Sequence, residues 1–213
     1  MPITINGDGT ITGYTPPIAD GSITSAKIAN GAVGTTHLAA NSVTHAKTTG
    51  LQRRISTTVT LPAANSITHN ITTGTKKIEI LVSNVSSANN SNLHILLGDS
   101  GGLETSGYGH AMGFHRTGVS NREGTVSTST AAFSTYGLDS SSYQIWGTWK
   151  LWNPTGNTWI AEHIFWGSAA DNHTFYGNGY KTLSGTMTQF NLACTSGNFD
   201  SGFLTIVETM GDD

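Results

Sequence analysis

The sequence predicts an all-β protein with a C-terminal β-sandwich head, of jelly-roll type, on a thin repetitive stalk, assembled as an intertwined homotrimer. Short segments rich in β-branched and aromatic residues recur between residues 56 and 210, and Gly, Asn and Ser separate them. These segments lack the period of about 3.6 residues that is typical of an amphipathic helix. Residues 18–47 carry an apolar residue at every fifth position instead, which indicates a separate element.

Residues 1–17 are expected to form an N-terminal hairpin that attaches the protein to a larger assembly. Ile3 and Ile5 alternate with polar neighbours, and the pattern resumes at residues 10–12 after Asn-Gly-Asp-Gly. This turn lacks the third oxygen ligand and the distal Glu of a calcium loop, so a plain turn is the better interpretation. An edge hairpin without a partner is the alternative.

Residues 18–50 are expected to form a trimerisation stalk of ten-residue repeats, IADGSITSAK, IANGAVGTTH and LAANSVTHAK. Five residues turn a helix by about 500° and move a strand side chain to the opposite face, so neither element gathers the apolar side chains on one side. A unit this thin needs a partner to bury them, and another copy of the same segment is the simplest one. A disordered linker and a pentapeptide β-helix are the alternatives. The apolar positions are Ile18, Ile23, Ile28, Val33, Leu38 and Val43.

Residues 51–213 are expected to fold as one head around a single core, because a segment of this length can bury most of its surface. Alternation and turn residues predict the strands in order. They are Ser56–Leu61, Ser66–Ile71, Lys77–Val85, Asn92–Leu97, Gly109–Arg116, Thr125–Phe133, Tyr143–Trp152, Thr158–Trp166, Thr174–Tyr180, Thr188–Cys194 and Gly202–Glu208.

All five tryptophans lie in two of these strands, which a turn at residues 153–157 joins. Strand alternation sorts each strand into two faces, of which one must be core. In the first strand, one face holds Tyr143, Ile145, Trp149 and Leu151, and the other holds Gln144, Trp146, Thr148, Lys150 and Trp152. In the second strand, one face holds Trp159, Ala161, His163 and Phe165, and the other holds Ile160, Glu162, Ile164 and Trp166. Indoles beside Lys and Glu are unusual on a simple solvent face.

Exposed aromatic rings with amides and hydroxyls nearby form a common platform for sugar rings. We therefore select Trp146, Trp152, Tyr176 and Tyr180 as candidate glycan-binding residues. Packing between subunits is the alternative role for each tryptophan.

The segment from Gly98 to Gly102, GDSGG, resembles the nucleophile segment of chymotrypsin-like serine proteases, in which Ser100 would attack the substrate. Leu103 replaces the usual proline, no Ala-Ala-His-Cys motif lies upstream, and a single cysteine, Cys194, cannot form the disulfides of that family. A strand-ending turn is the better interpretation, and we expect no enzyme.

The composition excludes several classes of ligand. Charged residues make up 11% of the chain without a basic patch, so no nucleic-acid binding is expected. No apolar run approaches a membrane span of about 20 residues, and the start does not resemble a secretory signal. The eight histidines lack ligand spacing and are interpreted as scattered strand residues, so neither a metal nor a cofactor is expected. Carboxylates are too distant in sequence to predict a glycosidase pair.

The start of the chain, ITINGDGTITGY followed by DGSITSAKIANGAV, is similar to the start of many bacteriophage tail-fibre proteins. The segments KKIEILVSNVS, ILLGDSGGLETSGY, LWNPTGNTWI and FDSGFLTIVE resemble the C-terminal domain of the same group. The resemblance implies a homotrimeric fibre of the virion, made in the cytoplasm of the host bacterium. Its N-terminus would attach to tail or capsid proteins, and its β-head would face the host cell and bind a surface glycan.

The chain departs from that group by being short, without a long shaft or a large anchor domain. A small auxiliary or capsid-decorating fibre therefore agrees with the sequence as well as a main tail fibre does. Two alternatives remain for its function: a structural or decorating fibre without a receptor role, and a fibre enzyme that trims polysaccharide.

Overall fold

The computed structural model describes residues 4–5, 7–8, 11–12, 54–116, 130–135, 143–168 and 173–211. The chain divides into two units, Met1–Thr49 and Gly50–Asp213. In the first unit, β1 (Thr4–Ile5) pairs antiparallel with β2 (Ile11–Thr12), which agrees with the expected hairpin. Its attachment role stays a prediction. The expected stalk, with its six apolar positions from Ile18 to Val43, lies outside the described residues.

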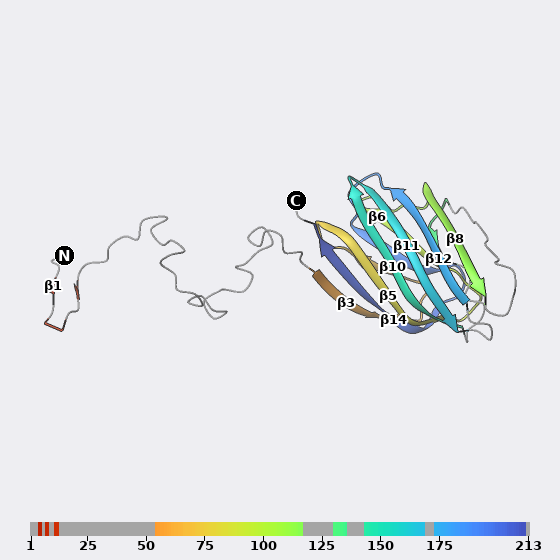
Figure 1. Cartoon of the computed structure of the whole chain (residues 1–213), viewed down its shortest axis with the longest axis horizontal. Helices are drawn as coiled ribbons and strands as arrows, with labels where there is room; N and C mark the ends of the chain where they lie inside the picture. Colours follow the sequence, from red (N-terminus) through yellow and green to blue (C-terminus); the bar gives the residue numbers. More distant parts are fainter. Residues whose placement is uncertain are drawn as a thin grey trace. The chain divides into compact units, whose positions relative to one another are not determined.

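Every regular element described in the second unit is a β-strand, and the strands form two sheets (Figure 1). The larger sheet has seven described strands in the order β3-β14-β5-β10-β11-β12-β8, all paired antiparallel. Their bounds are Arg54–Thr60 (β3), Phe199–Met210 (β14), Thr75–Ser87 (β5), Gln144–Thr155 (β10), Thr158–Ser168 (β11), His173–Thr182 (β12) and Tyr108–Arg116 (β8).

The smaller sheet has the order β4-β13-β6-β7, and β9 also pairs with β6. Its strands are Ser66–Asn70 (β4), Gln189–Cys194 (β13), Leu93–Asp99 (β6), Gly102–Leu103 (β7) and Phe133–Ser134 (β9). The all-β class is therefore confirmed for the part of the chain that the structure describes. The jelly-roll connection, the stalk and the trimer stay predictions.

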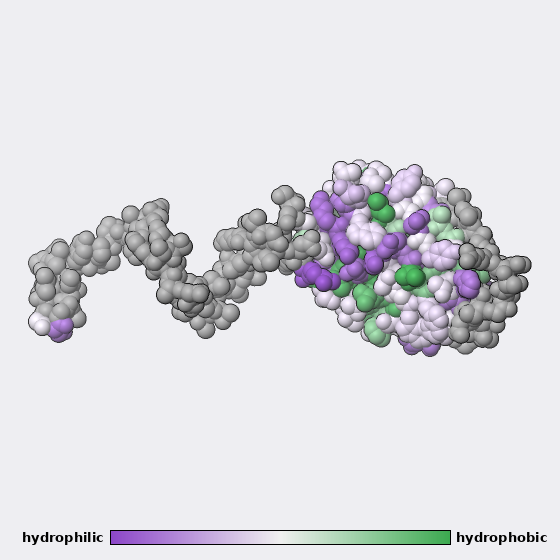
Figure 2. Space-filling view, in the orientation of Figure 1, coloured by the Kyte–Doolittle hydropathy of each residue, from purple (hydrophilic) through white to green (hydrophobic). Residues whose placement is uncertain are grey.

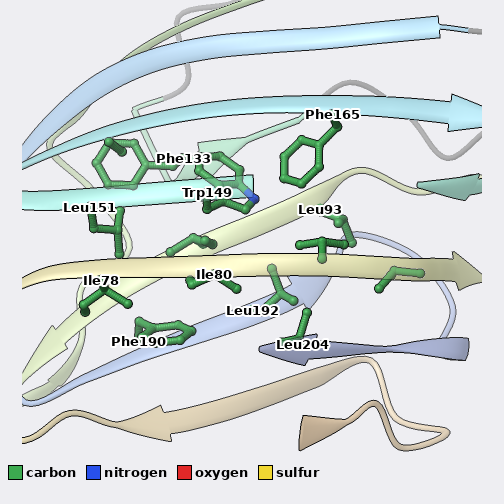
Figure 3. Close-up of a cluster of buried hydrophobic side chains, with 14 of the residues drawn as sticks. Ile78, Ile80, Leu93, Phe133, Trp149, Leu151, Phe165, Phe190, Leu192 and Leu204 are labelled. Atoms are coloured by element: carbon green, nitrogen blue, oxygen red, sulfur yellow. The ribbon is translucent and has the colours of Figure 1, made fainter. Parts of the chain in front are cut away.

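Both sheets contribute side chains to one hydrophobic core (Figure 3). Core side chains come from one face of each strand, because successive residues of a strand point to opposite faces. In β11, residues 159–167 are alternately buried and exposed. Complete burial of one large apolar side chain contributes about 1.5–3 kcal/mol, so this cluster is the main source of stability of the head. Its fully buried members include Ile78, Ile80, Leu93, Phe133, Trp149, Leu151, Phe190, Leu192 and Leu204.

The predicted strands coincide with observed strands within three residues at each end, with one exception. The expected strand at residues 125–133 lies mostly outside the described residues, and its last residue, Phe133, begins β9. The expected link at residues 153–157 is shorter than predicted, because β10 continues to Thr155, which pairs with Thr158. The Asn153 amide donates to the carbonyl oxygens of Gly156 and Thr158 at 2.7 and 2.9 Å, and this closes the tight turn.

Candidate functional site

The outward side chains of β10, β11, β12 and β8 form the surface that we call the outer face. The strand register arranges them in four rows across the sheet. These rows are Trp146–Trp166–Thr174–His115, Thr148–Ile164–Tyr176–Gly113, Lys150–Glu162–Asn178–Ala111 and Trp152–Ile160–Tyr180–Gly109. Figure 2 views the molecule from the same direction as Figure 1, in which the larger sheet lies in front, and it shows isolated hydrophobic residues among pale and hydrophilic ones.

The four predicted glycan-binding residues all lie on the outer face, although they do not converge on one point. Trp146 packs against Trp166, with ring centroids 5.2 Å apart, and Trp152 is half-buried in the row of Tyr180. Tyr176 and Tyr180 are the most accessible of the four, at 50% and 58% exposure. The structure therefore places the two tyrosines, rather than the two tryptophans, where a ligand has access to the ring.

An open groove of about 530 Å³ lies on the outer face beside Tyr176. Four strands line it, and its outward-facing residues are Thr148, Glu162, Ile164, Tyr176, Asn178, Ala111 and Gly113. β8 presents only small outward side chains there, Ala111 and Gly113, so the groove is open on this side. Of the predicted residues, Tyr176 alone lines the groove.

Two glycines of β8 determine how the tyrosine rings lie. A Cβ atom added to Gly113 would be 3.0 Å from Cζ and Oη of Tyr176, and one added to Gly109 would be 2.5 Å from Cε1 of Tyr180. Each ring therefore leans over the backbone of β8 at a position without a side chain. Leaning supports one side of each ring and leaves the other side open to solvent.

In the row Lys150–Glu162–Asn178–Ala111 of the outer face, and on the neighbouring strand β5, positive and negative side chains pair with each other. Lys150 pairs with Glu162 at 3.3 Å, and Glu79 on the neighbouring β5 pairs with Lys77 at 3.0 Å and with Arg54 at 3.4 Å. Glu162 is the acidic residue that lines the groove, and Asn178 adds an exposed amide beside it. The groove thus offers hydrogen-bond donors and acceptors without a cation of its own among its lining residues.

Two histidines come together in the core under the outer face. The ring centroids of His163 and Trp149 lie 4.2 Å apart, and those of His110 and His163 lie 5.7 Å apart. Both histidines are 4% exposed, and their ring nitrogens have no hydrogen-bond partner within the described residues. Burial lowers the pKa of His110 to about 4, assisted by His94, and that of His163 to about 3, assisted by His110.

The expectation of scattered histidines is therefore wrong for His110 and His163. Strand β12 separates β8 from β11, but its core-facing residues there are Gly177 and Gly179. A Cβ atom on Gly177 would be 2.5 Å from Cε1 of His163. Glycine thus leaves the space in which the two rings meet across β12.

The GDSGG segment forms the turn between β6 and β7, as expected. Asp99 is buried, and its Oδ1 accepts the backbone N–H of Gly101 at 2.7 Å, while Gly102 adopts a φ of +110°. Hydrogen bonds from the Ser184 hydroxyl and from this N–H lower the pKa of the Asp99 carboxyl. Asp99 therefore stabilises a turn, and Ser100 is exposed beside it.

Within the described residues, no three His, Cys, Asp or Glu side chains are placed to bind one metal ion. A search of the same residues finds no helix with the length and apolarity needed to cross a membrane. Comparison of the chain with protein-family models, curated proteins and solved structures finds no match.

From the sequence, Ile164, Glu162 and Trp166 were expected to share one face of their strand but were not selected as site residues, and Asn178 and the small residues of β8 were missed. A sequence pattern that could indicate Asn178 and the small residues of β8 is present in two short segments, YGNGY at residues 176–180 and GHAMG at residues 109–113. The first alternates tyrosine or asparagine with glycine, and the second alternates small residues with larger ones. Their significance depends on β12 and β8 being neighbours, which the structure supplies.

Proposed function

We propose that this chain is a non-enzymatic fibre protein of a bacteriophage particle that attaches to a glycan on the host-cell surface. The N-terminal hairpin joins tail or capsid proteins, the stalk holds three chains together, and the head presents the outer face. The resemblance of the repeats and head segments to tail-fibre proteins supports the virion setting. Three weak sites on one trimer would raise avidity by a factor of ~10²–10⁴ over a single site.

The observation that carries the glycan role is the outer face itself. The exposed ring of Tyr176 lines a groove that also holds an amide and a carboxylate, and the exposed ring of Tyr180 lies on the same face. Aromatic rings stack on the apolar faces of sugar rings, and the polar groups can bind sugar hydroxyls. Ile164 adjoins Tyr176 and Ile160 adjoins Tyr180 on this face, and adjoining exposed apolar side chains are typical of an interaction surface.

The glycan role predicts retention without cleavage. Full-length protein would be incubated with purified lipopolysaccharide and capsular polysaccharide from a panel of bacterial strains, and we expect at least one glycan to bind at unchanged chain length. Co-sedimentation measures the binding, and size-exclusion chromatography measures the length. Shortened glycan would support the polysaccharide-trimming enzyme instead, and a complete lack of retention would support a structural fibre.

The exposed aliphatic side chains Ile160 and Ile164, at 42% and 58% exposure, favour one second candidate, in which the outer face packs against another subunit. In that case the head would have a structural role, as in a decorating fibre. Charged side chains are depleted at the centre of subunit interfaces, however, and Lys150 and Glu162 lie beside these isoleucines.

The trimer is tested by solution mass. The full chain is expected to have three times its monomer mass of 22.4 kDa. Deletion of residues 18–47 is expected to yield monomers, because the stalk buries its apolar residues only between chains. Analytical ultracentrifugation measures both. Ile164→Glu serves as the matched variant in the head and should leave the mass unchanged. A trimer that survives the deletion but dissociates in Ile164→Glu would assign assembly to the outer face, and a monomeric full chain would contradict the trimer.

A further inference from the structure

We propose that the groove and the adjoining surface of β12 bind a neutral oligosaccharide that lies along this strand, with sugar rings stacked on Tyr176 in the groove and Tyr180 beyond it, and hydroxyls bound by Asn178 and Glu162. This inference rests on the proposed function and adds the class of ligand, its direction and the residues that hold it.

The direction follows from the positions of the two tyrosines. They are four residues apart on one strand, which places them about 13–14 Å apart along β12. One sugar ring cannot contact both side chains at this distance, whereas a chain of several sugars can. The ligand is therefore an oligosaccharide whose long axis follows the strand.

The rings of Tyr176 and Tyr180 are both exposed and restricted in rotation, which favours stacking of a sugar ring on them. Both lean over β8 at Gly113 and Gly109, which limits their rotation, and both stay at least half exposed. A side chain that is already held in place loses little conformational entropy when a ligand covers it. The glycines of β8 thus let both tyrosine rings adopt a fixed orientation in the absence of ligand.

The polar groups lie between the platforms. Asn178 occupies the position midway between the tyrosines on the same face of β12, and Glu162 is its register partner on β11. An amide both donates and accepts hydrogen bonds, and a carboxylate accepts two or more. Hydroxyls of the central sugars would meet these groups while the outer sugars stack on the rings.

The third side of the groove is left free by β8. Its outward residues opposite Tyr176, Asn178 and Tyr180 are Gly113, Ala111 and Gly109. These are the smallest side chains available, and β8 is the last described strand on this side of the sheet. The tyrosine rings cover Gly113 and Gly109, so Ala111 is the residue of the three that stays exposed, and its small side chain leaves room for a ligand between the rings.

The charge distribution selects a neutral ligand. Glu162 carries the negative charge of the groove, and its partner Lys150 lies on the far side of β11 from β12. A sugar carboxylate or sulfate beside Glu162 would be repelled, because like charges at contact distance are unfavourable. A neutral sugar avoids this repulsion, and its hydroxyls can donate hydrogen bonds to the carboxylate.

Titration calorimetry of the full-length protein tests the inference. The probes are neutral hexasaccharides of glucose, galactose or mannose, the matching monosaccharides, and an oligogalacturonate of the same length. We expect at least one neutral hexasaccharide to bind more than tenfold more tightly than its monosaccharide and than the oligogalacturonate. Tyr176→Ala and Tyr180→Ala should each weaken binding about tenfold. Phe203→Ala, which removes a ring 44% exposed on β14 of the same sheet, is the matched control and should leave affinity unchanged.

Three results would overturn the inference: no binding of any neutral probe, tighter binding of the oligogalacturonate, or equal affinities of Tyr176→Ala and Phe203→Ala. Retention of bacterial surface glycan by the intact protein separates this failure from that of the proposed function. If Tyr176→Ala still retains the glycan that the parent protein retains, the adhesive role stands and only the groove assignment fails. If neither glycan nor oligosaccharide binds, both fail.

Discussion

Acidification from pH 6.5 to 4.5 is expected to lower the free energy of unfolding of the head by roughly 3–5 kcal/mol. His110 and His163 stay neutral in the folded head, because burial lowers their pKa values to about 4 and about 3 from 6.5. In the unfolded chain they become protonated as the pH falls below 6.5. The unfolded chain then binds more protons than the folded one, so stability decreases as the pH falls.

The structural basis is that the ring nitrogens of the pair have no hydrogen-bond partner among the residues that the structure describes. Aromatic rings of Trp149, Phe165 and Phe133 contact the pair, and the charge of a further histidine, His94, also disfavours protonation of His110. A second positive charge at this position would add repulsion. Protonation of His110 or His163 therefore favours the unfolded chain, in which water solvates the charged imidazole, over the folded core.

Urea unfolding followed by tryptophan fluorescence at several pH values measures this effect. His163→Leu should reduce the pH dependence by about half, since an apolar side chain of similar size does not titrate there. His115→Leu, which removes an exposed histidine of β8, is the matched control and should change the slope little. A free energy of unfolding that does not vary between pH 6.5 and 4.5 would contradict the prediction.

The carboxylates do not interfere within this window. Hydrogen bonds lower the pKa values of Asp99, Glu104 and Glu208 below their ordinary values of 3.8 and 4.5. A carboxylate of this kind contributes stability above its ordinary pKa and loses it only as the pH falls further. The interval above pH 4.5 therefore reports mainly the histidines.

The faces of β10 and β11 were predictable from sequence because a strand has a period of two. With one face buried, a shift of one residue would expose Trp149 and Phe165 and bury Lys150 and Glu162, so the pattern allows a single arrangement. The buried and exposed positions of both strands agree with that prediction. The alternation within each strand is therefore sufficient to predict which of its side chains are buried.

The groove was not predictable in this way, because it depends on which strands are neighbours. β8 and β12 are far apart in sequence and pair directly, while β9, β10 and β11 lie between them along the chain. Neither segment alone indicates that Gly113 lies under Tyr176. The same limit explains why His110 and His163 were expected to be scattered, although glycines of β12 bring their rings together.

Replacement of Glu208 by Leu is expected to lower the free energy of unfolding by about 3–5 kcal/mol. Glu208 is 3% exposed on β14, where it accepts the backbone N–H of Thr72 at 2.7 Å and the Thr75 hydroxyl at 2.9 Å. Its other oxygen lies 3.0 Å from Nε2 of His69 on β4. One carboxylate therefore connects a strand of the larger sheet to the smaller sheet and to the start of β5.

Burial by itself would raise the pKa of Glu208, but the hydrogen bonds from His69, Thr72 and Thr75 outweigh it and lower the pKa. The charged form is thus the one that the fold stabilises. Leucine has a similar size and leaves packing nearly unchanged, while it removes every acceptor from these donors. The loss should therefore come from buried polar groups without partners rather than from a cavity.

Glu79→Leu is the matched control for Glu208→Leu, and urea unfolding at pH 7 compares the two. Glu79 lies on β5 of the same sheet and has two cationic partners, Lys77 and Arg54, but its side chain is 23% exposed and faces solvent. Ion pairs of this kind contribute about 0–1 kcal/mol, because water screens them. A much larger effect at Glu208 would show that burial, rather than the number of partners, determines what a carboxylate contributes to this fold. Similar effects at both positions would contradict that account.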